Sequence, residues 1–498
     1  VSEVCIKPND FQLESNAYNF VVDNNANLIQ INDTASNSGE ITVNRTYNFS
    51  NGRLEYNFIT SPVNNGNIKP NIYPVVPKSV QRYNEGNYYF YETVGPYVPG
   101  LAYAVQESPG NEGEMPQTGV FKGEFYNGIL DYSMAYTGPG YNLVGNPYPS
   151  NLDIKKLYDA NKGSDSLNLD IDRNFYFWDN RTNQIHHQMG SGYTQNQYAV
   201  FNAASGTEGS GVSAPRVNEP GSGMPARIPD RYTKVGTGFM LQALKPGVTL
   251  HFENSYRLKA GTIDYTGKPG QSDEVETNDG RYWLTLTTPS GIEPMLAVVY
   301  FPSGNDDFAI DDTESFMSSN DIYTFAGNNR LAIQGKGSFA NTDQIPLGYK
   351  AFETGTHIIS VYQPEGVFEN EQSIYLVDKL LNKTVNLSQK PYKFITRKGQ
   401  TDNRFMIVYR PGNTIGVAAD IRNVVDFAKI DNQIVITSSI DKITEVELFD
   451  LNSRPVFKKS EINSNEYRID AVNFNHQIVV VKVKTETGEL VTRKFVNN

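Results

Sequence analysis

Hydrophobic and polar residues alternate along most of the chain in short runs. In "RYWLTLTTP", Trp283 and Thr285 fall on one face and Leu284 and Leu286 on the other, because successive side chains of a strand point to opposite faces. The same alternation recurs in "MLAVVYF", "HIISVYQ", "QSIYLVD", "RFMIVYR", "QIVITSS" and "QIVVVKVKTE". These runs are rich in β-branched and aromatic residues and are separated by Gly, Asn, Asp and Pro. The pattern therefore predicts an all-β chain of tandem sandwiches of the jelly-roll or Ig-like kind.

The stretch "GYNLVGNPYPSNLD", residues 140–153, interrupts this alternation. A short strand stops at Gly145, and the two prolines that follow cannot donate to a β-ladder. Ser150 has no histidine nearby in sequence, and the G-x-S-x-G nucleophile elbow is missing. We interpret the stretch as a strand-to-helix corner rather than a catalytic loop.

A helix is expected directly after this corner, in "NLDIKKLYDAN", residues 151–161. Asn151 is a suitable N-cap residue, and Leu152 and Leu157 are expected to face inward. The later stretch 203–234 is dominated by Gly, Ser and Pro, which predicts an exposed loop or an insertion between strands.

Composition excludes several classes of protein. The net charge is −12 and the basic residues are scattered, so a nucleic-acid partner is not expected. Cys5 is the single cysteine, so no disulfide within the chain and no cysteine-based zinc site can form; we expect it to be buried. The 31 tyrosines against two tryptophans are typical of a β-rich extracellular surface.

No run of about 18 apolar residues occurs, so we expect no transmembrane helix. The first residues, Val1-Ser2-Glu3, lack the basic and apolar lead of a signal peptide. The chain is therefore expected to be either cytosolic or a trimmed product, and its C-terminal motifs favour the second alternative.

Candidate catalytic chemistry is sparse. The histidines do not form H-x-H or H-E-x-x-H motifs, and we expect no zinc site, no Ser-His-Asp site and no enzymatic activity. They are His186, His187, His251, His357 and His476.

Calcium is the one metal that the sequence could hold. Carboxylates are dense in "DSLNLDID" and in "GNDDFAIDDTESF", and Ca²⁺ prefers oxygen ligands. Neither run matches the EF-hand loop, so a solvated acidic turn remains the alternative. If an ion binds, we expect Ca²⁺ at Asp306, Asp307, Asp311 and Asp312.

The aromatic run "NYYFYE", residues 87–92, permits two interpretations. Exposed rings could form a platform on which sugars stack. Alternating Tyr and Phe in a strand could instead provide core packing on one face and cross-strand pairs on the other.

A compact β module follows a linker of small and polar residues at 411–423. Its core is expected to contain Val435, Val446, Leu448, Val456, Ile469, Val479 and Val481. A turn, "DLNSR", joins two strands at 450–454, and a final hairpin turns at Thr487-Gly488.

This module resembles the C-terminal sorting domain of type IX secretion substrates. The resemblance covers roughly 424–498 and rests on a strand followed by "LFDLNSRPV" and on a final hairpin that closes with "GELVTRKFV". Ser453-Arg454 stands where the family usually has Gly-Arg. The resemblance implies that the terminal hairpin is presented to the export machinery. The implied sorting-signal residues are Arg454, Val479, Val481, Gly488, Arg493, Lys494, Phe495 and Val496.

The upstream sequence resembles modules of large surface proteins that are secreted by the same route, and its N-terminal part resembles the end of a β-solenoid. The expected domains are a β region at 1–90, a β-sandwich at 91–262 with the long loop 203–234, a second sandwich at 275–411, and the Ig-like sorting domain at 424–498.

The resemblance implies a secreted, adhesin-like protein of the cell surface that crosses the outer membrane. Its implied partners are the type IX translocon, outer-membrane shuttle and attachment proteins, and surface glycans. Two alternatives remain open, a secreted glycan-binding or glycan-active protein and a structural surface or filament subunit. An exposed edge strand that pairs with a neighbouring chain would favour the subunit.

Overall fold

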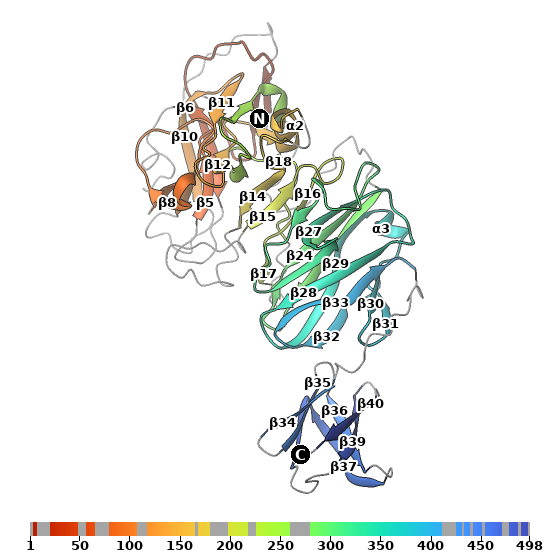
Figure 1. Cartoon of the computed structure of the whole chain (residues 1–498). Coiled ribbons are helices and arrows are strands. Elements are labelled where there is room, and N and C mark those ends of the chain that lie inside the picture. The colour runs from red at the N-terminus through yellow and green to blue at the C-terminus, as the bar shows by residue number, and fades with distance from the viewer. Residues whose placement is uncertain are drawn as a thin grey trace.

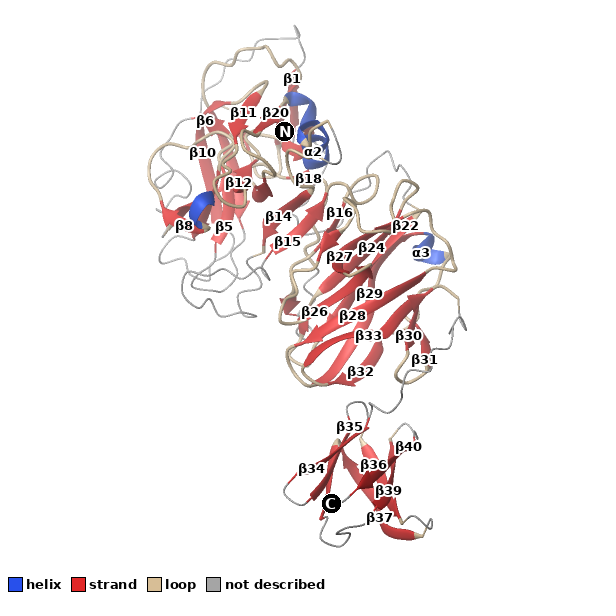
Figure 2. Cartoon of the chain, in the orientation of Figure 1, coloured by secondary structure: helices blue, strands red, loops and turns tan. Residues whose placement is uncertain are grey.

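Strands make up most of the computed structural model, and helices are few and short (Figure 2). The predicted all-β class is therefore confirmed. The structure describes residues 3–6, 20–47, 56–64, 79–106, 117–164, 168–179, 198–217, 226–258, 279–410, 425–430, 433–438, 442–450, 454–470, 478–486 and 490–496. The expected domain breaks at 411–423 and at 260–275 lie outside these residues.

The N-terminal part, residues 20–125, packs two four-stranded sheets against each other, with orders β2-β4-β10-β6 and β5-β9-β7-β8. Its elements are β2 (Val21–Val22), β3 (Asn27–Gln30), β4 (Ile41–Tyr47), β5 (Tyr56–Thr60), β6 (Val63–Asn64), β7 (Val80–Asn84), η1 (Glu85–Asn87), β8 (Tyr89–Glu92), β9 (Ala102–Gln106) and β10 (Gln117–Phe125). The preceding strand β1 (Glu3–Ile6) pairs with β3. β4 pairs with β10, and β5 with β9. The sheets thus join residues on both sides of the boundary expected at 90/91.

The middle part, residues 126–258, surrounds the sheet β12-β19-β14-β15-β16. Its elements are β11 (Leu130–Ser133), β12 (Tyr141–Gly145), β13 (Asn151–Asp153), α2 (Ile154–Asn161), β14 (Asn174–Trp178), β15 (Tyr198–Asn202), β16 (Ser210–Val212), β17 (Arg216–Val217), β18 (Tyr232–Thr233), β19 (Gly238–Gln242), β20 (Thr249–Phe252), η4 (Asn254–Tyr256) and β21 (Arg257–Leu258).

The expected helix is present but begins three residues later than predicted. Asn151 and Leu152 belong to β13, and Asp153 caps α2 by accepting hydrogen bonds from the N–H groups of Lys155 and Lys156 at 3.1 Å each. Asn151 is therefore not the cap, because it lies in β13 and pairs with Leu258 of β21. Leu152 and Leu157 are fully buried, as expected.

The corner after β12 is structural, as the sequence indicated. A Cβ at Gly145 would approach the Thr60 side chain to 2.6 Å, so the strand end must be glycine. Tyr148 is fully buried beneath the guanidinium of Arg257, which lies 4.7 Å from the ring centre. Arg257 also donates to the Ser150 hydroxyl at 3.1 Å. Ser150 is thus held as a hydrogen-bond acceptor inside the corner.

The large sandwich, residues 279–410, contains an 11-stranded sheet that folds around one hydrophobic cluster (Figure 1). Its elements are β22 (Gly280–Thr287), β23 (Ile292–Glu293), β24 (Met295–Tyr300), β25 (Thr313–Glu314), β26 (Asp321–Ala326), β27 (Asn329–Lys336), β28 (Gln344–Ala351), β29 (Gly355–Gly366), α3 (Val367–Asn370), β30 (Tyr375–Asp378), β31 (Lys383–Asn386), β32 (Tyr392–Thr396) and β33 (Gly399–Val408). β17 pairs with β23, which ties the middle part to the sandwich.

The stretch predicted as the exposed loop 203–234 is largely buried in its described residues. Ser205, Ser210 and Ala214 are almost inaccessible to water. Val212 and Ala226 join a hydrophobic cluster with Trp283 of β22. The expectation of exposure is wrong here, because small residues let the backbone pass between the middle part and the sandwich.

The C-terminal module, residues 425–496, has two sheets with orders β34-β35-β38 and β37-β36-β39-β40. Its strands are β34 (Val425–Ile430), β35 (Gln433–Ser438), β36 (Ile443–Phe449), β37 (Pro455–Ser464), β38 (Glu466–Asp470), β39 (Ile478–Thr485) and β40 (Leu490–Val496). They enclose a hydrophobic cluster of their own.

The predicted core of this module is mostly confirmed, since Val446, Leu448, Ile469, Val479 and Val481 belong to that cluster.

Two members of the predicted core differ. Val435 is buried but lies outside the cluster, to which Ile434 and Ile436 on either side of it belong. Val456 is 40% exposed, and Phe457 packs against the core in its place. The prediction for Val456 is therefore wrong.

Candidate functional site

The terminal hairpin places β40 at one edge of its sheet. β40 pairs with β39 from Leu490 opposite Lys484 to Val496 opposite Ile478, and no described strand pairs with its other side. Val479 and Val481 of β39 are fully buried. These two predicted sorting residues therefore support the fold of the hairpin from inside.

The structure describes the remaining predicted sorting residues only in part. The backbones of Arg493, Lys494, Phe495 and Val496 lie in β40, while their side chains and all of Gly488 lie outside the described residues. Arg454 is exposed at the start of the turn's return strand, and its N–H donates to the Asp450 carboxylate at 2.9 Å.

The aromatic run at 87–92 is exposed at another sheet edge. β8 is the edge strand of β5-β9-β7-β8. Tyr88, Tyr89 and Tyr91 are 65%, 51% and 38% exposed. Phe90 points the other way and packs on Tyr83, with ring centres 5.1 Å apart. Phe90 is thus directed inward, as the packing interpretation expects, and three tyrosines are exposed; sugar binding at these rings stays a prediction.

The four aspartates predicted to hold calcium do not surround a common point. Asp306 pairs with Lys336 at 2.6 Å, and Asp307 is exposed. Asp311 accepts from the Asn305 N–H at 2.9 Å, and Asp312 accepts from the N–H groups of Ala309 and Gly335.

Across the described residues, no group of three or more His, Cys, Asp or Glu side chains is placed to hold a metal ion. The acidic stretch at 306–312 acts instead as a set of loop caps.

The two histidines that the structure describes, His251 and His357, have different surroundings. His251 is exposed and lies 2.6 Å from Asp131 across the β11–β20 pair. His357 is buried beside Phe394, and burial lowers its pKa. His186, His187 and His476 lie outside the described residues, as does the side chain of Cys5.

A cavity of about 260 Å³ lies where the middle part meets the large sandwich. One wall comes from 208–211 and another from 226–232, both within the stretch predicted to be an exposed loop. The third comes from β22 and β29 of the sandwich. The indole N–H of Trp283 donates to the Gly211 carbonyl at 2.7 Å, which fixes the first wall to β22.

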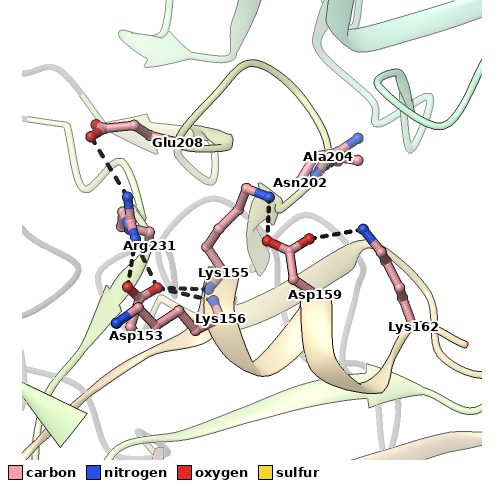
Figure 3. A network of polar contacts seen from close by, with 9 residues as sticks. All are labelled: Asp153, Lys155, Lys156, Asp159, Lys162, Asn202, Ala204, Glu208 and Arg231. Carbon is pink, nitrogen blue, oxygen red and sulfur yellow. Dashed lines mark hydrogen bonds and ion pairs between the residues drawn. The ribbon is translucent and has the colours of Figure 1, made fainter. Parts of the chain in front are cut away.

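Two arginines line this cavity, and each already faces a carboxylate. Arg281 donates to Glu365 at 2.6 Å and to the Gly209 carbonyl at 3.1 Å. Arg231 donates to Asp153 at 2.6 Å and lies 3.7 Å from Glu208 (Figure 3). Figure 3 also shows that Asp153 is the carboxylate that caps α2, so Arg231 is anchored to the start of that helix.

Asp230 differs from these groups because no cationic side chain of the described residues lies at contact distance from its carboxylate. Its Oδ1 accepts from the Tyr232 N–H at 2.7 Å, whereas its Oδ2 is buried and has no partner among the described residues. Burial raises the pKa of Asp230 to about 7, while the Tyr232 N–H and the charge of Arg281 act in the opposite direction. The carboxyl group can therefore gain or lose a proton near neutral pH.

The backbone of β29 is distorted beside this cavity. Glu365 pairs with Arg281 and Tyr362 with Trp283, so two residues of β29 oppose Tyr282 alone, which is a β-bulge. Gln363 in this bulge lines the cavity and has φ of 44°. A left-handed backbone at a non-glycine residue costs about 1 kcal/mol, and such strain is concentrated at binding sites.

Sequence reasoning missed this cavity. The charged and aromatic triplet Asp230-Arg231-Tyr232 inside a Gly-, Ser- and Pro-rich stretch was the available signal. The other lining residues, on β22 and β29, lie about 50 to 135 residues away in the chain. The sequence pattern therefore could not predict that they contact the triplet.

Comparison with known families gives two matches. The family described as a domain of unknown function (DUF8693) matches residues 8–409, and a second domain of unknown function (DUF8694) matches residues 414–497. A search of curated proteins finds no match. In the described part of the chain, no helix has the length and apolar character needed to cross a membrane.

Proposed function

The chain belongs to the family described as a domain of unknown function (DUF8693), and we propose that it is a secreted, adhesin-like protein of the cell surface. Export proceeds through the type IX secretion system, which recognises the C-terminal module. The partners in export are the translocon and the outer-membrane shuttle and attachment proteins.

The observation that carries this proposal is the C-terminal module with its free edge. The module has its own hydrophobic cluster, and the two family matches meet between 409 and 414, just before it. A sorting domain that folds separately from the exported protein needs such a hydrophobic core of its own. No strand among the described residues pairs with the outer side of its last strand, β40, and a receptor can add a strand to such an edge.

The adhesive part of the proposal is supported by β8. Exposed aromatic rings on an edge strand provide apolar faces with hydroxyl groups, which suit contact with sugars and with other proteins. Tyr89 and Tyr91 share one face of that strand, because they are two residues apart. We place the glycan contact at this surface.

Export can be tested with residues 411–498 fused to a reporter that carries an export signal, in a type IX-competent cell. We expect the fusion to reach the surface, and we expect deletion of residues 489–498 or the double change Arg493→Ala/Lys494→Ala to abolish this. The matched control is Lys482→Ala/Lys484→Ala, which removes two positive charges from the adjacent strand. Equal surface display by the control and both variants would refute the sorting assignment.

Adhesion can be tested by binding of the full chain to extracted surface polysaccharides. Tyr88→Ala/Tyr89→Ala/Tyr91→Ala should reduce binding at least tenfold, whereas Tyr136→Ala, a change at another exposed tyrosine, should not. Undiminished binding by the triple variant would exclude β8 as the contact surface.

A further inference from the structure

We propose that the cavity between residues 208–211, residues 226–232 and strands β22 and β29 binds a small organic cation, whose ammonium or guanidinium group pairs with Asp230. This site lies in the DUF8693 part of the chain and is independent of the proposed export function. The inference rests on a carboxylate oxygen without a donor, the charge balance of the walls, and the size and shape of the cavity.

The first observation is the carboxylate oxygen Oδ2 of Asp230. A buried carboxylate oxygen without a hydrogen-bond donor is costly, and native proteins rarely leave one in that state. Asp230 Oδ2 has no donor among the described residues, although the residue lines a cavity that can admit one. Because the terminal torsion of an aspartate is soft, a small rotation presents this oxygen to a ligand.

The net charge of the cavity walls determines whether a cation or an anion is favoured as ligand. The lining contains three carboxylates, on Glu208, Asp230 and Glu365, and two guanidinium groups, on Arg231 and Arg281. Both guanidinium groups are already opposed by Asp153 or Glu365 at 2.6 Å. Counted with Asp153, four carboxylates face two guanidinium groups, so the walls carry an excess of two negative charges when Asp230 is ionised. An anionic ligand would add to this excess, whereas a cationic ligand reduces it.

The size and the walls limit the rest of the ligand. A volume of about 260 Å³ corresponds to about eight or nine water molecules, which suits a ligand with roughly ten non-hydrogen atoms. Phe201, Ile228 and Tyr362 supply apolar surface around the charged groups. A short alkyl chain that carries an amine or guanidine fits this mixture, as in a diamine, agmatine or a lysine or arginine side chain.

The β-bulge of β29 also favours ligand binding at this cavity. It places Gln363 at the cavity with a strained backbone. Its side-chain amide can donate to or accept from a second polar group of the ligand. The strain persists because the pairs on both sides, Arg281 with Glu365 and Trp283 with Tyr362, hold the strand in place.

Binding should depend on pH in a direction that the charges determine. The groups that act on Asp230 are Arg281 and Arg231, which favour its ionised form, and Glu208, which opposes it. Since the pKa of Asp230 is about 7, the carboxyl is largely protonated below that pH, and a cation must displace the proton. The affinity should fall about tenfold for each pH unit below 7 and level off above it.

The experiment is isothermal titration calorimetry of the full chain with agmatine and 1,5-diaminopentane, with glucose and glutamate as neutral and anionic probes. We expect both amines to bind at pH 8 and to bind about tenfold more weakly at pH 6. Glucose and glutamate should not bind. Asp230→Asn should abolish amine binding, whereas Asp307→Asn, a change at an exposed aspartate outside the cavity, should leave it unchanged.

Thermal unfolding separates loss of the site from loss of the fold. Because Asp230→Asn removes a buried, uncompensated charge, we expect the variant to melt at or above the temperature of the unchanged protein at pH 8. Amine binding that persists in a folded Asp230→Asn variant, preferential binding of glucose or glutamate, or no binding of either amine would each overturn the proposal.

Discussion

At the residue scale, Glu85 joins two segments that are about 50 residues apart. It is 5% exposed in η1, and its carboxylate accepts hydrogen bonds from the N–H groups of Thr137, Gly138 and Gly140 and from the Thr137 hydroxyl, at 2.6 to 2.8 Å. These donors precede β12, so the contact fixes the N-terminal part against the middle part.

Replacement of Glu85 by Gln should reduce the free energy of unfolding by about 2–4 kcal/mol. The amide NH₂ of glutamine would face N–H donors, and buried donors would lose their acceptor. Urea unfolding at pH 7 measures the difference. The control Glu40→Gln, at an exposed position, should change it by less than about 0.5 kcal/mol.

The same residue should make stability depend on pH. Burial acts to raise the pKa of Glu85, but the hydrogen bonds from Gly140, Thr137 and Gly138 prevail and lower it below 4.5. A carboxylate with a lowered folded-state pKa stabilises the protein above its unfolded-state pKa and loses this contribution as pH falls. The difference in stability between the unchanged protein and the Glu85→Gln variant should therefore shrink below about pH 4.5, and a constant difference down to about pH 3 would contradict this assignment.

At the scale of single elements, β37 shows how a bulge overrides an alternating pattern. Leu448 pairs with Phe457 and Phe449 pairs with Pro455, which leaves Val456 as the extra residue of a β-bulge. The bulge shifts the following residues to the other face. Phe457 consequently packs against the core and Val456 faces outward.

This register predicts opposite outcomes for two neighbouring substitutions. Phe457→Ala should destabilise the C-terminal module by about 2–3 kcal/mol, because it removes most of a ring that packs on the core. Val456→Ala should change its stability by less than about 0.5 kcal/mol. Thermal unfolding of the module distinguishes them, and a larger loss for Val456→Ala would show that the register is wrong.

At the scale of the whole molecule, shared hydrophobic clusters unite the chain as far as residue 410. Phe58 and Ala102 of the N-terminal part pack with Leu143 and Met240 of the middle part. The middle part in turn shares a cluster with β22 and β24 of the sandwich. The described contacts from this body to the C-terminal module are few, chiefly through Leu380 and Leu381.

Calorimetry of the full chain should therefore show a separate transition for the C-terminal module. A chain that ends at residue 410 should retain the main transition within about 3 °C, because its clusters are intact. Residues 411–498 alone should unfold cooperatively, although loss of the contacts with Leu380 and Leu381 should lower their melting temperature by a few degrees. A single transition that disappears on truncation would contradict two independent cores.

The alternation of apolar and polar residues determined the all-β class, because the period of a strand is a local property. Local chemistry also determined the corner at Gly145 to Ser150 and the buried positions of Val446, Leu448, Val479 and Val481, all of which are confirmed. Proline, glycine and strand periodicity act over a few residues, so no distant partner was needed to predict these features.

Tertiary structure alone decided how distant residues meet. The stretch 203–234 looked like an exposed loop, yet Trp283 and its neighbours on β22 bury much of it and form the cavity around Asp230. Likewise, the aspartates at 306–312 are close in sequence, but Lys336, Gly335 and the loop's own N–H groups draw them apart. Burial and charge pairing depend on residues that only folding brings near one another. The spacing of residues in the sequence does not predict these contacts.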